Sequence, residues 1–230
     1  VLVFIGACLQ GIGGIGFSMF AAPLAALAAP VMVPGPLLLL GALVSLMAAW
    51  RERAAIAWPV AWRCIGGRCV GAVLAAAIVV ALPGRALAAA FGVLLLGGVG
   101  LSAAGWKVAA TPRNAWLAGT LSGVMGTITS AGAPPLGLLT QHLAPSAIRA
   151  TVGSVIALGA VASLVMLGLA GQFDHHHAVL GVALVPWIVA GFQLSNTLAR
   201  RISAAGTRRL LLLLVTGSAL VVLGKALVGP

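Results

Sequence analysis

The sequence has 230 residues, of which 62% are hydrophobic and only 7% are charged, and its mean hydropathy is +1.19. Two residues are acidic, and the formal net charge is +11. A soluble domain needs many more charged side chains to cover its surface, so this composition excludes a soluble globular protein. The basic residues lie between apolar stretches, so we interpret them as determinants of membrane orientation and expect no nucleic-acid partner.

Turn-forming residues divide the chain into apolar stretches of about 20 residues, the length that crosses a hydrocarbon core about 30 Å thick. We expect eight such stretches, at 1–28, 34–50, 59–82, 85–106, 114–143, 145–170, 177–199 and 208–228. The sequence therefore predicts an all-α polytopic membrane protein with a single transmembrane domain over residues 1–230.

Two of these stretches contain helix-breaking residues near the middle. The first contains Gly11-Ile12-Gly13-Gly14-Ile15-Gly16, and the fifth contains Gly123, Gly126 and the run from Thr127 to Pro135. In lipid, an interrupted helix is tolerated only where it is buried in protein or lines a water-filled cavity. Both interruptions are therefore candidate elements of a functional site.

The two interrupted stretches also indicate an internal duplication. A shift of 112 residues aligns Gly11, Gly14, Ser18 and Pro23 with Gly123, Gly126, Ser130 and Pro135, without a gap. We expect two repeats, residues 1–110 and 111–230, each with a broken or re-entrant helical hairpin followed by three transmembrane helices.

The distribution of basic residues favours re-entrant hairpins. If all eight stretches crossed the membrane, the basic residues would be divided almost evenly between its two sides. If the first and fifth stretches re-enter, only Arg85 and Lys225 lie on one side, and the other side carries Arg51, Arg53, Arg63, Arg68, Lys107, Arg113, Arg149, Arg200, Arg201, Arg208 and Arg209. The positive-inside rule then places these basic loops in the cytoplasm and makes the two repeats inverted, as in secondary transporters.

A half-helix that starts within the membrane exposes unpaired N–H groups and the positive end of its dipole. Pro134 and Pro135 predict one such start, and the repeat places another near Gly16–Ser18. Two such ends that point into one cavity would bind an anion without a buried lysine or arginine. We expect hydroxyl contacts from Ser18, Thr127, Thr129 and Ser130, and close backbone approach at Gly13, Gly14, Gly16, Gly126 and Gly132. Alternatively, these glycines serve only helix packing.

Three polar residues near the end of the second hairpin are further candidates. Gln141 and His142 could contact the substrate, and His142 could couple transport to protons. Arg149 could attract anions to the cytoplasmic mouth, or act only as an orientation anchor. Since the three consecutive histidines after Asp174 cannot all converge on one ion, we expect no metal and no cofactor.

The segment from Gln10 to Ser18 with Pro23, its echo from Gly119 through Pro134-Pro135, and Arg149-Ala150-Thr151 resemble the TauE/SafE family of sulfite and organosulfonate transporters. The resemblance covers nearly the whole chain. It implies passage of sulfite, sulfoacetate or a related anion across a bacterial inner membrane, with recognition by the residues of the broken helices, Gln10 included.

The predicted function is therefore a secondary transporter for such an anion. A negative cell interior drives anions outward with about 2.3 kcal/mol per charge per 100 mV, which favours export. An anion channel or uniporter of the same architecture and an uptake permease for an organic anion remain alternatives. We expect no enzyme, because Ser130 and His142 lack the motif and spacing of a serine hydrolase. The sequence leaves the coupling ion and the oligomeric state open, a homodimer included.

Overall fold

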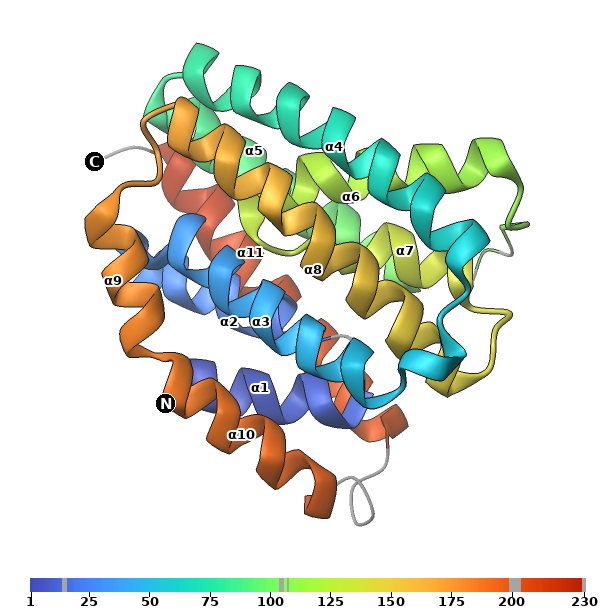
Figure 1. Cartoon of the computed structure of the whole chain (residues 1–230). Coiled ribbons are helices and arrows are strands. Elements are labelled where there is room, and N and C mark those ends of the chain that lie inside the picture. The colour runs from blue at the N-terminus through green and yellow to red at the C-terminus, as the bar shows by residue number, and fades with distance from the viewer. Residues whose placement is uncertain (14–15, 104–105, 107, 199–203, 229–230) are drawn as a thin grey trace.

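The computed structural model describes residues 1–13, 16–103, 106, 108–198 and 204–228 (Figure 1). These residues form helices joined by short turns, and no β-strand occurs among them. The predictions for Gly14, Lys107, Arg200 and Arg201 fall outside the described residues.

The helices follow one another closely along the chain. The first half contains α1 (Leu2–Gly13), α2 (Phe17–Ala28), the 3₁₀ turn η1 (Pro30–Met32), α3 (Gly35–Arg51), the 3₁₀ turn η2 (Arg53–Ala55), α4 (Trp58–Ala81) and α5 (Gly84–Ala103). The second half contains α6 (Pro112–Thr129), α7 (Ala133–Thr140), α8 (Pro145–Leu169), α9 (His175–Ala183), α10 (Val185–Leu198) and α11 (Ala204–Val228).

Both predicted helix interruptions are confirmed. In the first, α1 ends at Gly13 and α2 begins at Phe17; in the second, α6 ends at Thr129 and α7 begins at Ala133. Ser130 ends α6 in the left-handed conformation, with φ of 61°, so the chain leaves the helix at this residue.

Several helices are long and apolar enough to cross a membrane. These are α4, α5, α8 and the stretch His175–Ser195, which covers α9 and most of α10; α1, α2 and α3 are shorter apolar helices. The outward faces of the long helices carry exposed aliphatic side chains such as Val80 and Leu169. Such a surface suits lipid rather than water. The structure is therefore that of a polytopic membrane protein.

The stretch predicted as one helix over 177–199 is divided, because α9 ends at Ala183 and α10 begins at Val185. Pro186 explains the division, since proline has no N–H to donate and its ring clashes with the preceding turn. In Figure 1 the two pieces follow one another end to end, with a visible bend between them.

Helices from the two halves pack against each other. α1 lies along α10, α4 along α6, α3 along α8, and α5 along α11. Small residues bring α4 and α6 together: a Cβ added at Gly119 would collide with the Cys64 carbonyl oxygen, and one added at Gly71 with the Thr120 carbonyl oxygen. Such close backbone approach is the usual basis of helix association in membranes.

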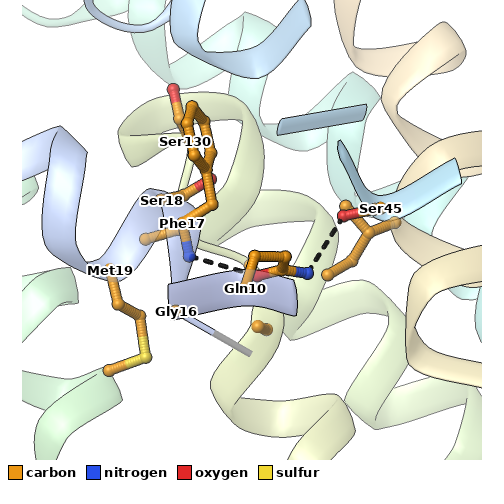
Figure 2. Close-up of a pocket in the computed structure, with 11 residues that line it drawn as sticks. Gln10, Gly16, Phe17, Ser18, Met19, Ser45 and Ser130 are labelled. Carbon is orange, nitrogen blue, oxygen red and sulfur yellow. Dashed lines mark hydrogen bonds between the residues drawn. The ribbon is translucent and has the colours of Figure 1, made fainter. Parts of the chain in front are cut away.

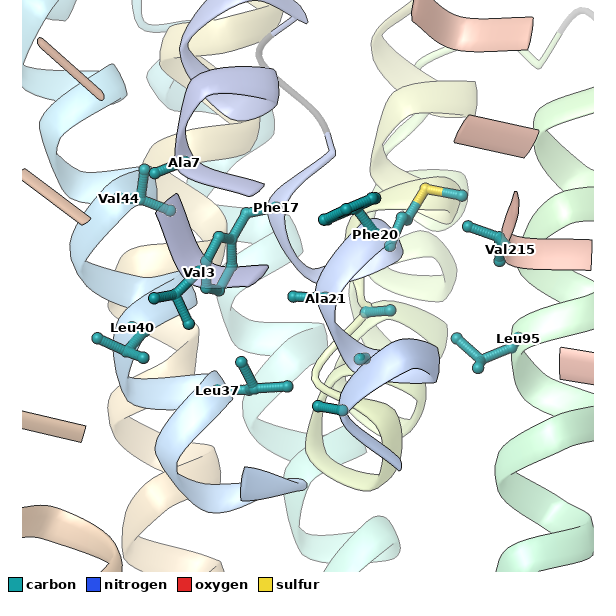
Figure 3. Close-up of a cluster of buried hydrophobic side chains, with 14 of the residues drawn as sticks. Val3, Ala7, Phe17, Phe20, Ala21, Leu37, Leu40, Val44, Leu95 and Val215 are labelled. Carbon is teal, nitrogen blue, oxygen red and sulfur yellow. The ribbon is translucent and has the colours of Figure 1, made fainter. Parts of the chain in front are cut away.

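The main apolar core surrounds α2 (Figure 3). Phe17, the first residue of α2, lies in a buried cluster with Val3 and Ala7 of α1 and with Leu40 and Val44 of α3. This core fixes the start of α2 in the interior of the protein, next to the first interruption.

Candidate functional site

The two interruptions meet at one small cavity (Figure 2). Its wall combines Gln10 of α1, the start of α2, Ser45 of α3, the link between α6 and α7, and Ile156 of α8; the lining residues are Gln10, Gly16, Phe17, Ser18, Met19, Ser45, Ser130, Ala131, Gly132, Ala133 and Ile156. The cavity has a volume of about 10 Å³, room for about one water molecule. Polar groups from segments more than a hundred residues apart thus line one small cavity.

At the first interruption, a side chain caps the new helix. Gln10 is 3% exposed, and its Oε1 accepts a hydrogen bond of 3.1 Å from the Phe17 backbone N–H. Its Nε2 donates to Ser45 Oγ at 3.5 Å, so one amide ties α1, α2 and α3 together (Figure 2). The next two backbone N–H groups of α2, those of Ser18 and Met19, lie in the first turn, where a helix supplies no acceptor. The start of α2 therefore offers donors to the cavity.

At the second interruption, hydroxyl groups stabilise the backbone. Thr129 Oγ1 donates to the Met125 carbonyl at 2.7 Å and accepts from the Ala131 N–H at 3.1 Å. Ser130 Oγ donates to the Pro34 carbonyl at 2.8 Å, which joins this interruption to the start of α3. These bonds satisfy the polar groups that the broken helix would otherwise leave unpaired.

The start of α7 is poorer in donors than the sequence suggested. Pro134 and Pro135 occupy its first turn, and proline carries no N–H. The positive end of the helix dipole is retained, but within α7 Ala133 is the only residue before Leu136 that carries a backbone N–H. Donors for an anion must therefore come largely from α2 and from side chains.

The structure divides the predicted site residues into two groups. Gln10, Gly16, Ser18, Ser130 and Gly132 line the cavity together. Gly13 is the last residue of α1, and Gly14 lies outside the described residues.

The other group does not line the cavity. Thr127 and Thr129 are fully buried behind it, and Thr127 Oγ1 donates to Ser163 Oγ at 2.8 Å. Pro134 packs towards α5, where a Cβ added at Gly98 would lie 3.1 Å from its Cγ. Gln141 and His142 are exposed after α7, and Gln141 Nε2 donates to the Trp106 carbonyl at 2.6 Å. Substrate contact by these residues stays a prediction.

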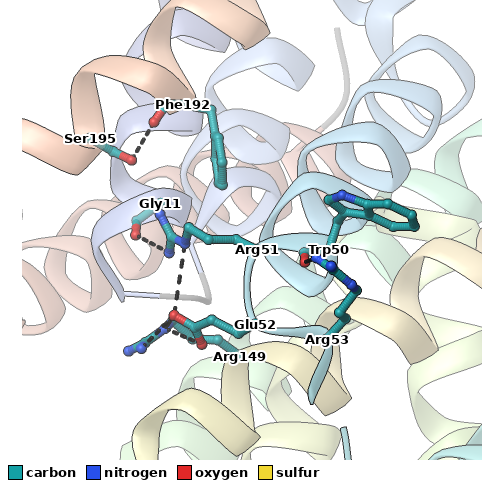
Figure 4. A network of polar contacts seen from close by, with 8 residues as sticks. All are labelled: Gly11, Trp50, Arg51, Glu52, Arg53, Arg149, Phe192 and Ser195. Atoms are coloured by element: carbon teal, nitrogen blue, oxygen red, sulfur yellow. Dashed lines mark hydrogen bonds and ion pairs between the residues drawn. The ribbon is translucent and has the colours of Figure 1, made fainter. Parts of the chain in front are cut away.

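Arg149 belongs to an ionic cluster at the helix ends (Figure 4). Its Nε and Nη2 donate to the Glu52 carboxylate at 3.0 and 2.7 Å, while Arg51 Nε lies 3.8 Å from Glu52 Oε1. Arg51 Nη2 also donates to the Gly11 carbonyl at 3.1 Å, and its guanidinium lies over the Phe192 ring. The cluster thus connects α3, α8 and the last turn of α1.

The prediction that Arg68 lies in a cytoplasmic loop is wrong. Arg68 lies in the middle of α4 and is 1% exposed. Its Nη1 donates to the Ser122 carbonyl at 2.8 Å and to Ser122 Oγ at 2.5 Å. Ser122 Oγ in turn donates to the Gly132 carbonyl at 2.6 Å. A buried arginine therefore lies beside the second interruption, which the sequence analysis did not expect.

Two sequence signals could have found this arginine. Arg68 falls well inside the stretch predicted as helix 59–82, so a loop position contradicted that helix. It is also flanked by Gly67 and Gly71, which let α4 approach a neighbouring helix closely. A charged residue within a membrane helix usually faces the protein interior and marks a functional position.

Among the described residues, no group of three His, Cys, Asp or Glu side chains is placed to hold a metal ion. Asp174 instead caps α9, with its carboxylate accepting from the His177 backbone N–H at 3.0 Å.

Apolar helices of spanning length that enclose two interrupted helices are typical of membrane transport proteins. The model of the family described as Sulfite exporter TauE/SafE matches residues 1–222, and the chain belongs to this family of multi-pass transporters. No curated protein and no solved structure was found to match the chain.

Proposed function

We propose that this protein is a secondary transporter that exports sulfite or a small organosulfonate or organic anion across the bacterial inner membrane. The anion is held between the two interrupted helices. One observation carries this proposal: Gly16 and Ser18 of the first interruption line the same cavity as Ser130 and Gly132 of the second. It is a transporter and not an enzyme, in keeping with its family.

The helix arrangement supports two inverted repeats, residues 1–110 and 111–230. The contact of α1 with α10 has its counterpart in that of α6 with α4, and the contact of α2 with α11 in that of α7 with α5. In Figure 1 the hairpin α1–α2 opens to the left, where the N-terminus lies, and the hairpin α6–α7 opens to the right. Inverted repeats of this kind let one site face the two sides of a membrane in turn.

The positions of the basic residues support a cytoplasmic location for the right-hand end in Figure 1. The end of α3 and the starts of α4, α6 and α8 all lie there, with Arg51, Arg63, Arg113 and Arg149 among their residues. Arg85, at the start of α5, lies at the opposite end. The positive-inside rule assigns the arginine-rich end to the cytoplasm.

The size of the cavity supports a carrier rather than an open pore. A volume of about 10 Å³ accommodates about one water but not an oxyanion with a sulfur centre and three oxygens. The anion can therefore enter only when the hairpins move apart, and such movement on one side at a time is alternating access. The membrane potential then drives the anion outward without a carboxylate in the spanning helices.

Flux measurements in proteoliposomes test this proposal. Purified protein is reconstituted in vesicles loaded with sulfite, sulfoacetate, taurine or lactate, and efflux is followed at an imposed potential that is negative inside. We expect saturable efflux of sulfite or sulfoacetate that is faster when the potential is larger. Single-channel currents would instead establish an anion channel. If none of these solutes left the proteoliposomes faster than it left loaded vesicles without protein, the proposal would be contradicted.

A further inference from the structure

Arg68 is a buried positive charge without a carboxylate partner. The chain contains two acidic residues, and both are engaged elsewhere: Glu52 pairs with Arg149, and Asp174 pairs with His177 before α9. Arg68 Nε has no hydrogen-bond partner among the described residues. Burying a charge without a counter-ion is strongly unfavourable, so this position calls for an anion.

The guanidinium of Arg68 lies directly behind the cavity wall. Three glycines make room for it: a Cβ added at Gly132 would lie 2.5 Å from Nη1, one at Gly126 would lie 2.7 Å from Nη2, and one at Gly159 would lie 2.5 Å from Nε. Gly132 itself lines the cavity, and Gly159 lies one helical turn beyond Ile156, another lining residue. The Nη1 end of the guanidinium therefore lies against Gly132, a residue of the cavity wall.

Among the described residues, a buried arginine lies beside the second interruption only, whereas Arg51, which bonds the Gly11 carbonyl at the first, is exposed and lies near Glu52. The shift of 112 residues that relates the two repeats places Leu180 at the position of Arg68, and Ser122 at that of Gln10. The first interruption is held by a neutral amide, Gln10, whereas the second is held by Ser122 and the arginine.

We propose that Arg68 supplies the fixed positive charge that binds the transported oxyanion at the second interruption; this inference rests on the proposed transport of an anion through the cavity. In the low-dielectric interior the charge acts across Gly132 with little screening. Ser122 fixes the guanidinium through Nη1 and leaves Nε as a donor for an oxyanion oxygen when the hairpins move.

Substitutions that separate charge from packing test this inference. We compare Arg68→Lys, Arg68→Gln and Ser122→Ala, and measure how sulfite and sulfoacetate raise the thermal unfolding midpoint of the purified protein. Arg68→Gln should weaken the apparent affinity about tenfold or more, because it removes a charge-assisted interaction. Arg68→Lys and Ser122→Ala keep the charge and should stay within about tenfold of the unmodified protein.

If Arg68→Gln does not fold, a second pair of variants tests whether Arg68 is an uncompensated buried charge. Ile156→Asp places a carboxylate in the cavity wall, and Ile156→Asn places a neutral side chain of the same shape there. If Arg68 is an uncompensated charge, the Asp variant gains a counter-ion and should unfold at a higher temperature than the Asn variant when no anion is present. A lower midpoint for the Asp variant would overturn the inference.

The measured affinities distinguish a failure of the role proposed for Arg68 from a failure of the proposed transport function. If the unmodified protein responds to anions and Arg68→Gln responds equally, the role of Arg68 is wrong and anion transport stands. If the unmodified protein itself shows no response to any of the anions, the proposed function fails, and the inference fails with it.

Discussion

Arg149 and Glu52 form a bidentate ion pair that joins the two halves of the protein. Arg149 Nε and Nη2 both lie within 3.0 Å of the Glu52 carboxylate oxygens (Figure 4). Glu52 follows α3 of the first half, and Arg149 lies in the first turn of α8 of the second half. Both side chains are largely shielded from solvent. The pair therefore holds the central contact of α3 with α8 at one end.

Loss of this pair should destabilise the protein. Glu52→Gln leaves Arg149 and Arg51 without their carboxylate, and we expect a loss of about 1–3 kcal/mol in the free energy of unfolding. Arg53→Gln is the matched control, because the Arg53 side chain is exposed and bonds the carbonyl of Trp50, three residues away on the same segment. The measurement is chemical unfolding in detergent micelles; equal stability of the two variants would show that the pair contributes nothing.

A bulky residue at position 18 should block transport. Ser18 lines the cavity and faces Gly41 of α3, where an added Cβ would lie 3.0 Å from Ser18 Oγ. Ser18→Leu fills a space that holds about one water, so we expect efflux from proteoliposomes to fall to the level of loaded vesicles without protein. Gly97→Leu on α5 lies outside the cavity, and a Cβ added there meets no atom within 4 Å, so this variant serves as the control. Normal efflux through Ser18→Leu would remove the first interruption from the pathway.

Substitution of the glycines between α4 and α6 should weaken the fold. Gly119→Ala drives a methyl group into the Cys64 carbonyl, which should cost about 1–3 kcal/mol because backbone atoms cannot move aside easily. Gly100→Ala on α5 meets no atom within 4 Å and should leave stability unchanged or raise it by about 0.5–1 kcal/mol. Thermal unfolding of both variants checks this, and a stable Gly119→Ala protein would contradict the close packing.

The two ends of the protein should label from opposite sides of the membrane. In a background where the exposed Cys69 is replaced by Ala, Arg63→Cys at the start of α4 should react with maleimide only from the cytoplasmic side. Arg85→Cys at the start of α5 should react only from the other side. Labelling of both positions from one side would exclude the proposed topology.

The cap of α9 should make stability depend on acidic pH. The hydrogen bond from the His177 backbone N–H, followed by that from its side chain, lowers the pKa of the Asp174 carboxyl below its usual value. A carboxyl whose pKa is lower in the folded protein stabilises it above the unfolded-state pKa, and this stabilisation is lost as pH falls through the folded-state pKa. Asp174→Asn should show a smaller fall in the unfolding midpoint between neutral pH and pH of about 3. An identical fall in both proteins would rule out this contribution.

The sequence predicted the features that depend on backbone chemistry. Clustered glycines and the Pro134-Pro135 pair mark residues where a helix cannot continue, and both interruptions occur there. That Gln10 and Ser130 share a cavity depends on how distant helices pack, and the repeat was the only sequence signal that brought them together.

The features that the sequence analysis missed depend on side-chain partners. Arg68 was assigned to a loop because basic residues near segment ends usually orient a membrane protein, whereas its burial depends on glycines of α6 and α8 that are distant in sequence. The hydrogen bonds of the Thr129 hydroxyl to the backbone on either side of the break were likewise not predicted, and its contact with a substrate stays a prediction. Local pattern could not reveal either partner.

Equilibrium binding of sulfite and sulfoacetate to variants of both interruptions tests the central claim most directly. Ser18→Ala removes the hydroxyl of the first interruption, and Ser130→Gly removes that of the second while glycine keeps the left-handed backbone. The Ser130 hydroxyl donates to the Pro34 carbonyl and is expected to turn to the anion when the anion binds. We predict that each change weakens affinity about fivefold, as expected for one lost hydrogen bond, and that the double variant departs from additivity because both residues serve one bound anion. Unchanged affinity in both single variants would contradict a shared anion site between the two interrupted helices.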